Sequence, residues 1–233
     1  MNALTRAELE VLAQWDTPTI CNGLELLDAA TRTRGFTTQP MACLDAKLKP
    51  IVGYARTALI RAATPPAGDA AAARAMRAHY YEHVAAQPQP SIAVLQDLDP
   101  DPGFGAFWGE VNTAIHKGLG CVGGITNGSF RDLDACAPGF QLLGGRVGPS
   151  HAWVHLTEIA CEVNIFGMAV RPNDIVHADR HGAVVVPPEC VKKLPAAIEL
   201  LVRREAVILE AARAPGFNVE ILKQAMADSA EIH

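Results

Sequence analysis

Three residues with complementary chemistry stand at the two ends of the stretch 110–132 of this sequence. Glu110 stands at the start of a helix-compatible run, and the pair Arg131-Asp132 follows one predicted helix and one predicted strand later. An arginine side chain binds a carboxylate through two parallel hydrogen bonds from its planar guanidinium. An aspartate is a hard oxygen ligand that suits Mg²⁺ or Mn²⁺. The stretch therefore predicts a site that holds a carboxylate and a divalent cation side by side.

The run Gly109–Asn112 offers a second way of holding negative charge. A helix that begins at a glycine leaves backbone N–H groups without partners in its first turn, and these suit a carboxylate or carbonyl oxygen. We expect a helix over residues 110–117, with the amides of Val111 and Asn112 at its open end. A compact helix–strand unit would return the Arg-Asp pair to that end.

Together these groups predict a metal-dependent carbon–carbon lyase that acts beside a pyruvate-type 2-oxo acid. The 2-oxo group and one carboxylate oxygen would be chelated by Mg²⁺ or Mn²⁺ held on Asp132, while Arg131 and the helix amides neutralise the remaining charge of the enolate. Glu110 would face the pocket and position a water or act as general acid or base. Each residue also has an ordinary explanation, because Arg-Asp after a turn is commonly a surface ion pair and a first-turn glutamate complements the helix dipole.

The histidines leave several roles open. His151 and His155 lie four residues apart, a spacing that places both on one face of a helix or on one side of a strand. Three roles are open for these two side chains: ordinary packing or interface hydrogen bonds, contact with the distal part of a substrate, or a softer metal site. His177 and His181 flank a turn and are expected to be structural or interface residues. His116 is expected on a helix surface.

The surrounding sequence supplies helices at both ends and strands between them. The pair Thr5 and Glu8 forms a capping-box pattern, and apolar residues then recur at helical spacing. Helices are predicted at about 5–15, 16–27, 69–86, 110–117 and over most of 188–226, and strands at 51–60, 91–95, 121–126 and 175–186, with shorter strands within 140–147 and 161–170. This order implies an α+β fold, layered as an α/β/β/α sandwich. We expect a single domain over residues 1–233 with a C-terminal helical extension from about residue 188.

Bulk composition narrows the class of partner. The chain has 233 residues, of which 49% are hydrophobic, and a formal net charge of -5, which argues against broad attraction to nucleic acid or to an anionic membrane. No stretch approaches the ~20 apolar residues of a membrane span, and the N-terminal segment has no signal-peptide core. We therefore expect a cytoplasmic protein with a small-molecule partner. Its six scattered cysteines contain no CxxC and are expected to be reduced.

One block of sequence carries a family resemblance. Residues 109–132, GEVNTAIHKGLGCVGGITNGSFRD, are similar to the pattern of the RraA-like superfamily, in which a Gly-Glu pair, an alanine-rich helix, a glycine-flanked strand and a G-x-x-R-D turn follow in that order. Residues 171–187 resemble its P-G-D-x-V-x-x-D-x-x-G-V-V-V-V-P element, and Asp16–Thr19 resembles its usual opening. The likeness spans roughly residues 15–210 and implies a sandwich of the swivelling β/β/α type.

The superfamily includes 4-hydroxy-4-methyl-2-oxoglutarate and 4-carboxy-4-hydroxy-2-oxoadipate aldolases, which also decarboxylate oxaloacetate, and the regulator of ribonuclease activity A. Resemblance to the aldolases implies a metal on Asp132, a substrate clamp of Arg131 and the backbone of residues 109–112, and a homotrimer or homohexamer with sites between subunits. In such aldolases a glutamate from a neighbour's C-terminal helix enters the site, and Glu205 is the best match here.

Two features of the resemblance leave the activity open. The segment Ser150–His155 departs from the aldolase pattern, because some family aldolases present a basic residue there toward the distal part of the substrate. Resemblance to the ribonuclease regulator implies a different function altogether, a non-enzymatic protein-binding regulator. Such a regulator would be indifferent to Mg²⁺ and to the loss of Asp132.

Overall fold

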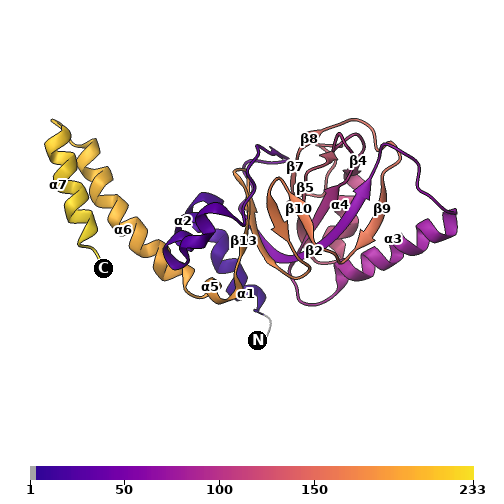
Figure 1. Cartoon of the computed structure of the whole chain (residues 1–233), viewed down its shortest axis with the longest axis horizontal. Helices are drawn as coiled ribbons and strands as arrows, with labels where there is room; N and C mark the ends of the chain where they lie inside the picture. Colours follow the sequence, from indigo (N-terminus) through magenta and orange to yellow (C-terminus); the bar gives the residue numbers. More distant parts are fainter. Residues whose placement is uncertain (1–3) are drawn as a thin grey trace.

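Helices dominate both ends of the chain and strands dominate the middle, which confirms the expected α+β class (Figure 1). The computed structural model describes residues 4–233. The α-helices are α1 (Arg6–Glu10), α2 (Thr17–Leu27), α3 (Ala70–Ala85), α4 (Glu110–Gly118), α5 (Pro188–Val191), α6 (Leu194–Arg213) and α7 (Val219–Ala230), with 3₁₀ turns at Val11–Gln14 and Ala29–Thr33. The strands are β1 (Ala42–Cys43), β2 (Ile51–Arg61), β3 (Ser91–Asp97), β4 (Ala106–Trp108), β5 (Cys121–Thr126), β6 (Ser129–Phe130), β7 (Gln141–Gly144), β8 (Arg146–Val147), β9 (His155–Ile159), β10 (Val163–Ile165), β11 (Met168–Val170), β12 (Ile175–Asp179) and β13 (Gly182–Val186).

The long strand β2 organises the main sheet. The strands follow the order β1-β7-β5-β3-β2-β12-β13, and the parallel run β2, β3, β5 and β7 forms its centre. The outer edge of β2 is shared by two antiparallel partners: β12 pairs with residues 51–54, and β9 pairs with residues 58–61. A separate sheet of three short parallel strands has the order β4-β6-β8.

Alternating side chains of β3 show how the two faces of the main sheet are covered. Ile92 and Val94 belong to a core cluster with the β10–β11 hairpin, while Ala93 and Leu95 pack with buried side chains of α3 and with aromatic residues around α4. Successive residues of a strand point to opposite faces, so one face carries the hairpin and the other carries α3 and α4. A third cluster joins α1, α2, α5 and α6 to the β12–β13 end of the sheet.

The C-terminal hairpin of α6 and α7 extends away from the sheet, at the opposite end of the molecule from α3 (Figure 1). Within residues 4–233, no helix combines the length and the apolar character needed to span a membrane. The six cysteines are free, and Cys121 and Cys190 are buried.

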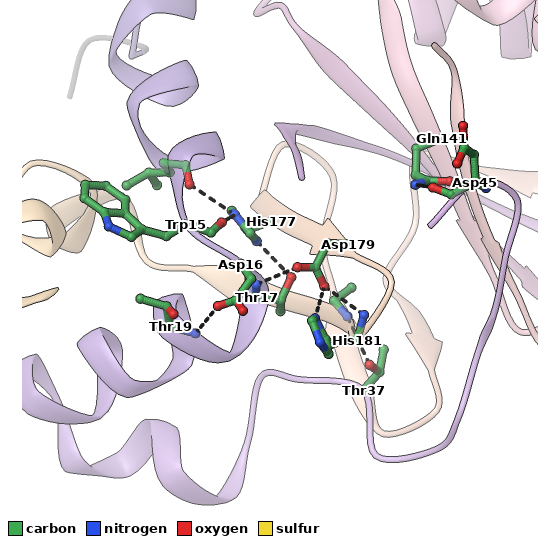
Figure 2. A network of polar contacts seen from close by, with 12 residues as sticks. Trp15, Asp16, Thr17, Thr19, Thr37, Asp45, Gln141, His177, Asp179 and His181 are labelled. Atoms are coloured by element: carbon green, nitrogen blue, oxygen red, sulfur yellow. Dashed lines mark hydrogen bonds and ion pairs between the residues drawn. The ribbon is translucent and has the colours of Figure 1, made fainter. Parts of the chain in front are cut away.

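A buried polar network attaches the start of α2 to β12 (Figure 2). The Asp179 carboxylate accepts hydrogen bonds from the backbone N–H groups of Thr17 (2.9 Å) and His181 (2.8 Å). The Nε2 of His177 lies 3.1 and 3.2 Å from two backbone carbonyls, so it carries the proton, and Nδ1 accepts from the Thr17 hydroxyl at 3.0 Å. Burial lowers the pKa of His177 to about 4, so the ring is neutral at pH 7. These contacts fit the structural role predicted for both histidines.

The prediction for His116 is wrong, because this residue is fully buried. Its Nε2 lies 2.8 Å from the Tyr80 hydroxyl, its Nδ1 lies 2.6 Å from the Asn112 carbonyl, and its ring centroid is 4.6 Å from that of Trp108. Thr113 and His116, three residues apart, form the inward face of α4. Burial lowers the pKa of His116 to about 4. A histidine whose two nitrogens both find partners is accommodated in the core as a neutral ring.

Candidate functional site

The small parallel sheet brings the two halves of the predicted site together. Trp108 of β4 and Phe130 of β6 are paired residues, and the Arg131 N–H continues the pairing by donating to the Trp108 carbonyl at 3.0 Å. In parallel neighbours the carboxyl ends of the strands lie at the same edge, so the residues after β4 and those after β6 start side by side. The segments Gly109–Asn112 and Arg131–Asp132 meet in this way.

Asp132 lies against the N-terminus of α4. Its Oδ2 accepts a hydrogen bond from the Glu110 N–H at 3.2 Å and lies 3.7 Å from the Arg131 Nε. Its Oδ1 has no hydrogen-bond partner within residues 4–233. A Cβ on Gly109 would stand 2.5 Å from the Asp132 Oδ2, so this close approach requires glycine. One carboxylate oxygen therefore caps the helix and the other is available to a ligand.

The open end of α4 keeps free donors. The first intrahelical bond runs from the Thr113 N–H to the Gly109 carbonyl, and the amides of Val111 and Asn112 donate to no group in the described chain. The Asn112 side chain serves another purpose, because it donates to the Phe107 carbonyl at 2.5 Å and accepts from a tyrosine hydroxyl of α3 at 3.2 Å. The backbone amides at this helix end can thus bind an anion. The Asn112 side chain holds the helix end in place through its bonds to the Phe107 carbonyl and the tyrosine.

The segments Gly109–Asn112 and Arg131–Asp132 line one pocket of about 600 Å³, a volume typical of small-molecule sites. The Arg131 and Asp132 side chains are 36% and 32% exposed, so both are reachable from solvent without being fully hydrated. Predicted site residues that line the pocket are Gly109, Glu110, Val111, Asn112, Arg131, Asp132, His151 and His155. The structure therefore gathers eight of the nine predicted positions in one cavity.

The two histidines line the same pocket, with His155 at the start of β9 and His151 in the segment before it. His151 Nδ1 is 2.8 Å from the Ala152 carbonyl, and His155 Nδ1 is 2.7 Å from the Trp153 carbonyl. A carbonyl only accepts, so each Nδ1 carries the proton in the neutral ring and each Nε2 is left as an acceptor. Either Nε2 can accept a proton from a bound molecule, or donate to an anion once the ring is protonated.

Arg77 of α3 is a pocket residue that the sequence did not suggest. It lines the same cavity as Arg131 and forms no ion pair or hydrogen bond within residues 4–233. Trp153, which is 59% exposed, forms part of the rim. The hydrophobic pattern of the sequence does not show that α3 packs near the segments around residues 110 and 131. It therefore could not identify Arg77 as a pocket residue.

Glu205 is the one predicted residue that lies elsewhere. It is exposed on α6, within the extended C-terminal part that lies at the opposite end of the molecule from α3 (Figure 1). A contribution of Glu205 to a site would therefore have to be made to another copy of the chain.

The donor set fits Mg²⁺ or Mn²⁺ better than zinc. In the part of the chain that the structure describes, no cluster of three or more histidine, cysteine, aspartate or glutamate side chains is placed to hold a metal. Mg²⁺ commonly keeps several waters and uses one or two carboxylates together with the substrate. Carboxylates available for such a role are Asp132, whose Oδ1 accepts no hydrogen bond within residues 4–233, and the neighbouring Glu110.

Comparison with solved structures confirms the expected layered fold. An uncharacterized protein from Pseudomonas syringae pathovar tomato is 21% identical, with a TM-score of 0.71 over 97% of this chain and 96% of that chain. The Streptomyces coelicolor protein RraAS2, described as an unusual member of the RNase ES inhibitor RraA family, is 20% identical, with a TM-score of 0.66 over 92% and 100%. A structure described as a novel cellulase from gut-associated microbes is 17% identical, with a TM-score of 0.70 over 88% of each chain. At these identities the likeness concerns the fold alone.

No curated protein sequence matches this chain. A family model does match, over residues 17–185, and its description is RraA-like, Aldolase/RraA. The match contains the Gly-Glu helix start, the Arg-Asp turn and the β12–β13 element, so it covers the segments that build the pocket. Both lyases and ribonuclease regulators occur in this family. The chain belongs to the RraA-like family.

Proposed function

We propose that the protein is a divalent-metal-dependent lyase that cleaves or decarboxylates a 2-oxo acid through a pyruvate enolate. The observation that carries the proposal is the meeting of Arg131, Asp132 and the open N-terminus of α4 in one pocket. A purely structural Arg-Asp pair needs neither free helix amides nor a cavity of substrate size beside it.

Three groups of this chain can hold the 2-oxo carboxylate. The Arg131 guanidinium can form two parallel hydrogen bonds to it, and the amides of Val111 and Asn112 can each donate one more. Secondary structure fixes the two amides, which belong to α4, and the backbone from which the Arg131 side chain extends, which is paired with β4. Donors that are already in place need no reorganisation when negative charge moves onto the 2-oxo oxygen.

Asp132 would hold the metal through its free Oδ1, with Glu110 beside it. Bound there, a divalent cation supplies Lewis-acid stabilisation of the developing oxyanion. Glu110 is exposed at the mouth of the helix and is placed to move a proton through water. The His151 and His155 side chains line the same pocket and can contact the part of the substrate that departs.

The same arrangement serves two related reactions. In decarboxylation of oxaloacetate, the bond to the departing carboxylate breaks, its electron pair forms the enolate, and protonation of the enolate gives pyruvate. In aldol cleavage of a 4-hydroxy-2-oxo acid, the C3–C4 bond breaks, the hydroxyl proton passes to a base such as Glu110, and C4 becomes a carbonyl. Both reactions need the same stabilised enolate, so the pocket supports the pair without deciding between them.

We extend the proposal to a homotrimer or homohexamer with sites between subunits. Exposed apolar side chains lie along the α6–α7 hairpin, among them Val202 (53% exposed), Val219 (64%) and Met226 (56%). Apolar surface on an extended hairpin favours burial against another copy. A neighbour's hairpin would bring Glu205 toward the pocket. Light scattering on the purified protein should give a trimer or hexamer, and a monomer would contradict this assembly.

The decisive experiment is an assay for pyruvate. Purified protein should release pyruvate from oxaloacetate or from 4-hydroxy-4-methyl-2-oxoglutarate in the presence of Mg²⁺, and removal of the metal with a chelator should lower the rate to the uncatalysed background. Readdition of Mg²⁺ or Mn²⁺ should restore it. Metal-independent turnover would contradict the mechanism.

A folded protein that neither turns over these compounds nor binds pyruvate or oxalate would overturn the lyase proposal. The family would then point to the alternative, a non-enzymatic protein-binding regulator.

A further inference from the structure

The pocket of the proposed active site continues into a second cavity. This second cavity has a volume of about 470 Å³ and lies along α3 and β9. The two cavities share four lining residues, namely Pro66, Ala73, Arg77 and His155. Shared walls make them two compartments of one groove, with Arg131 and Asp132 in the first compartment and the four shared residues at the junction.

The lining of the second compartment is mostly apolar. Ala72, Met76 and Leu156 contribute hydrocarbon surface from α3 and β9, and Pro65 adds more from the loop between β2 and α3. Its one cation beyond the junction is Arg61, whose guanidinium already donates to the Leu98 carbonyl (3.1 Å) and to the Asp99 carboxylate (3.4 Å). The compartment thus offers hydrocarbon contact, and the charge of Arg61 is already paired with Asp99.

We propose that the second compartment is a subsite for an apolar alkyl or aryl group on the distal half of the 2-oxo acid substrate. The inference rests on the proposed function, since that function fixes the 2-oxo carboxylate in the first compartment. A pyruvyl unit alone fills little of a 600 Å³ pocket. A substrate with an extended apolar tail passes the junction and removes the hydrocarbon surface of both compartments from water.

Binding of a chain-length series tests the subsite without requiring turnover. The probes are pyruvate, 2-oxohexanoate and 2-oxooctanoate, titrated calorimetrically into the full-length protein with Mg²⁺ present. Each methylene that enters an apolar compartment improves the dissociation constant by about fourfold. We expect 2-oxooctanoate to bind at least tenfold more tightly than pyruvate.

A pair of variants on α3 locates the effect. Ala73→Leu enlarges an exposed residue at the junction, whereas Ala75→Leu enlarges an exposed residue of the same helix that lines neither compartment. Leucine and alanine are both strong helix formers, so both variants should fold. Ala73→Leu should reduce the preference for 2-oxooctanoate over pyruvate by at least about fivefold, because it narrows the path to the second compartment. Ala75→Leu should keep the wild-type preference.

The outcomes separate the subsite from the proposed reaction. Pyruvate binding without any gain along the series, or an equal effect of the two variants, would overturn the subsite and leave the lyase proposal standing. A chain-length gain that only Ala73→Leu reduces, in a protein that releases pyruvate from neither oxaloacetate nor 4-hydroxy-4-methyl-2-oxoglutarate, would support the subsite and count against cleavage of these two compounds. Absence of both binding and turnover would overturn both.

Discussion

Replacing Asp132 by asparagine is expected to lower kcat/KM for oxaloacetate by on the order of 10³-fold, with the fold intact. In the proposed mechanism this carboxylate is the principal anionic ligand of the metal, and its Oδ1 accepts no hydrogen bond within residues 4–233. An amide oxygen is a much weaker ligand for Mg²⁺, so the cation that stabilises the enolate would be lost at ordinary concentrations. A high Mg²⁺ concentration should recover part of the rate, because the affinity for the metal has fallen.

Asparagine is a better test here than alanine because Asp132 also has a structural role. Its φ of 57° lies in the left-handed region, which asparagine tolerates better than other non-glycine residues. The asparagine side-chain oxygen can still accept the Glu110 N–H, so the cap on α4 is kept. Alanine would remove that cap and lower the free energy of unfolding by about 1 kcal/mol. A lower activity could then come either from the less stable fold or from the lost metal ligand.

Asp134→Asn is the matched control for this variant. Asp134 has the same side chain two residues later, is exposed and does not line the pocket. The Asp134→Asn variant should retain the wild-type kcat/KM, and both variants should show the wild-type unfolding midpoint in urea. Metal-dependent turnover within about threefold of wild type in Asp132→Asn would remove Asp132 from the proposed role.

Local sequence signals predicted most elements of this fold. The cap of α1 by Thr5, the long strand from Ile51 and the hairpin around residue 180 all follow from short-range patterns that tertiary packing did not need to override. The meeting of Arg131 and Asp132 with the helix at Glu110 was predicted as well. The pairing of β4 with β6, which brings these residues together, was not predicted. The two strands are too short to show periodicity in the sequence and depend on pairing with each other.

The residues that escaped prediction depend on contacts between distant segments. His116 looks like a surface residue until Tyr80, more than thirty positions earlier, supplies a partner inside the core. Arg77 becomes a pocket residue only because α3 packs across the sheet beside β9. In each case the local sequence fixes the helix and its polar residue, and a long-range contact decides whether that residue faces solvent, core or pocket.

Replacing Arg131 by lysine is expected to lower kcat/KM for oxaloacetate by roughly 10²-fold, which is typical for loss of one preorganised donor to an oxyanion. Lysine keeps the positive charge but has no planar fork, so it cannot form two parallel hydrogen bonds to a carboxylate. The backbone is unaffected, because the bond from the residue 131 N–H to the Trp108 carbonyl does not involve the side chain. Arg180→Lys, an exposed replacement at the β12–β13 turn, should leave the kinetics unchanged.

The size of the Arg131→Lys effect also decides which group binds the carboxylate. If Arg131 is the clamp, the variant should raise KM and lower kcat together, since the fork binds both the substrate and the charge that develops from it. If the amides of Val111 and Asn112 are sufficient, the loss should stay below about fivefold, because a nearby ammonium supplies a similar field. Steady-state kinetics of wild type and Arg131→Lys at saturating Mg²⁺ distinguishes these two possibilities. The N-terminus of α4 is the same in both proteins, and only the guanidinium has been replaced.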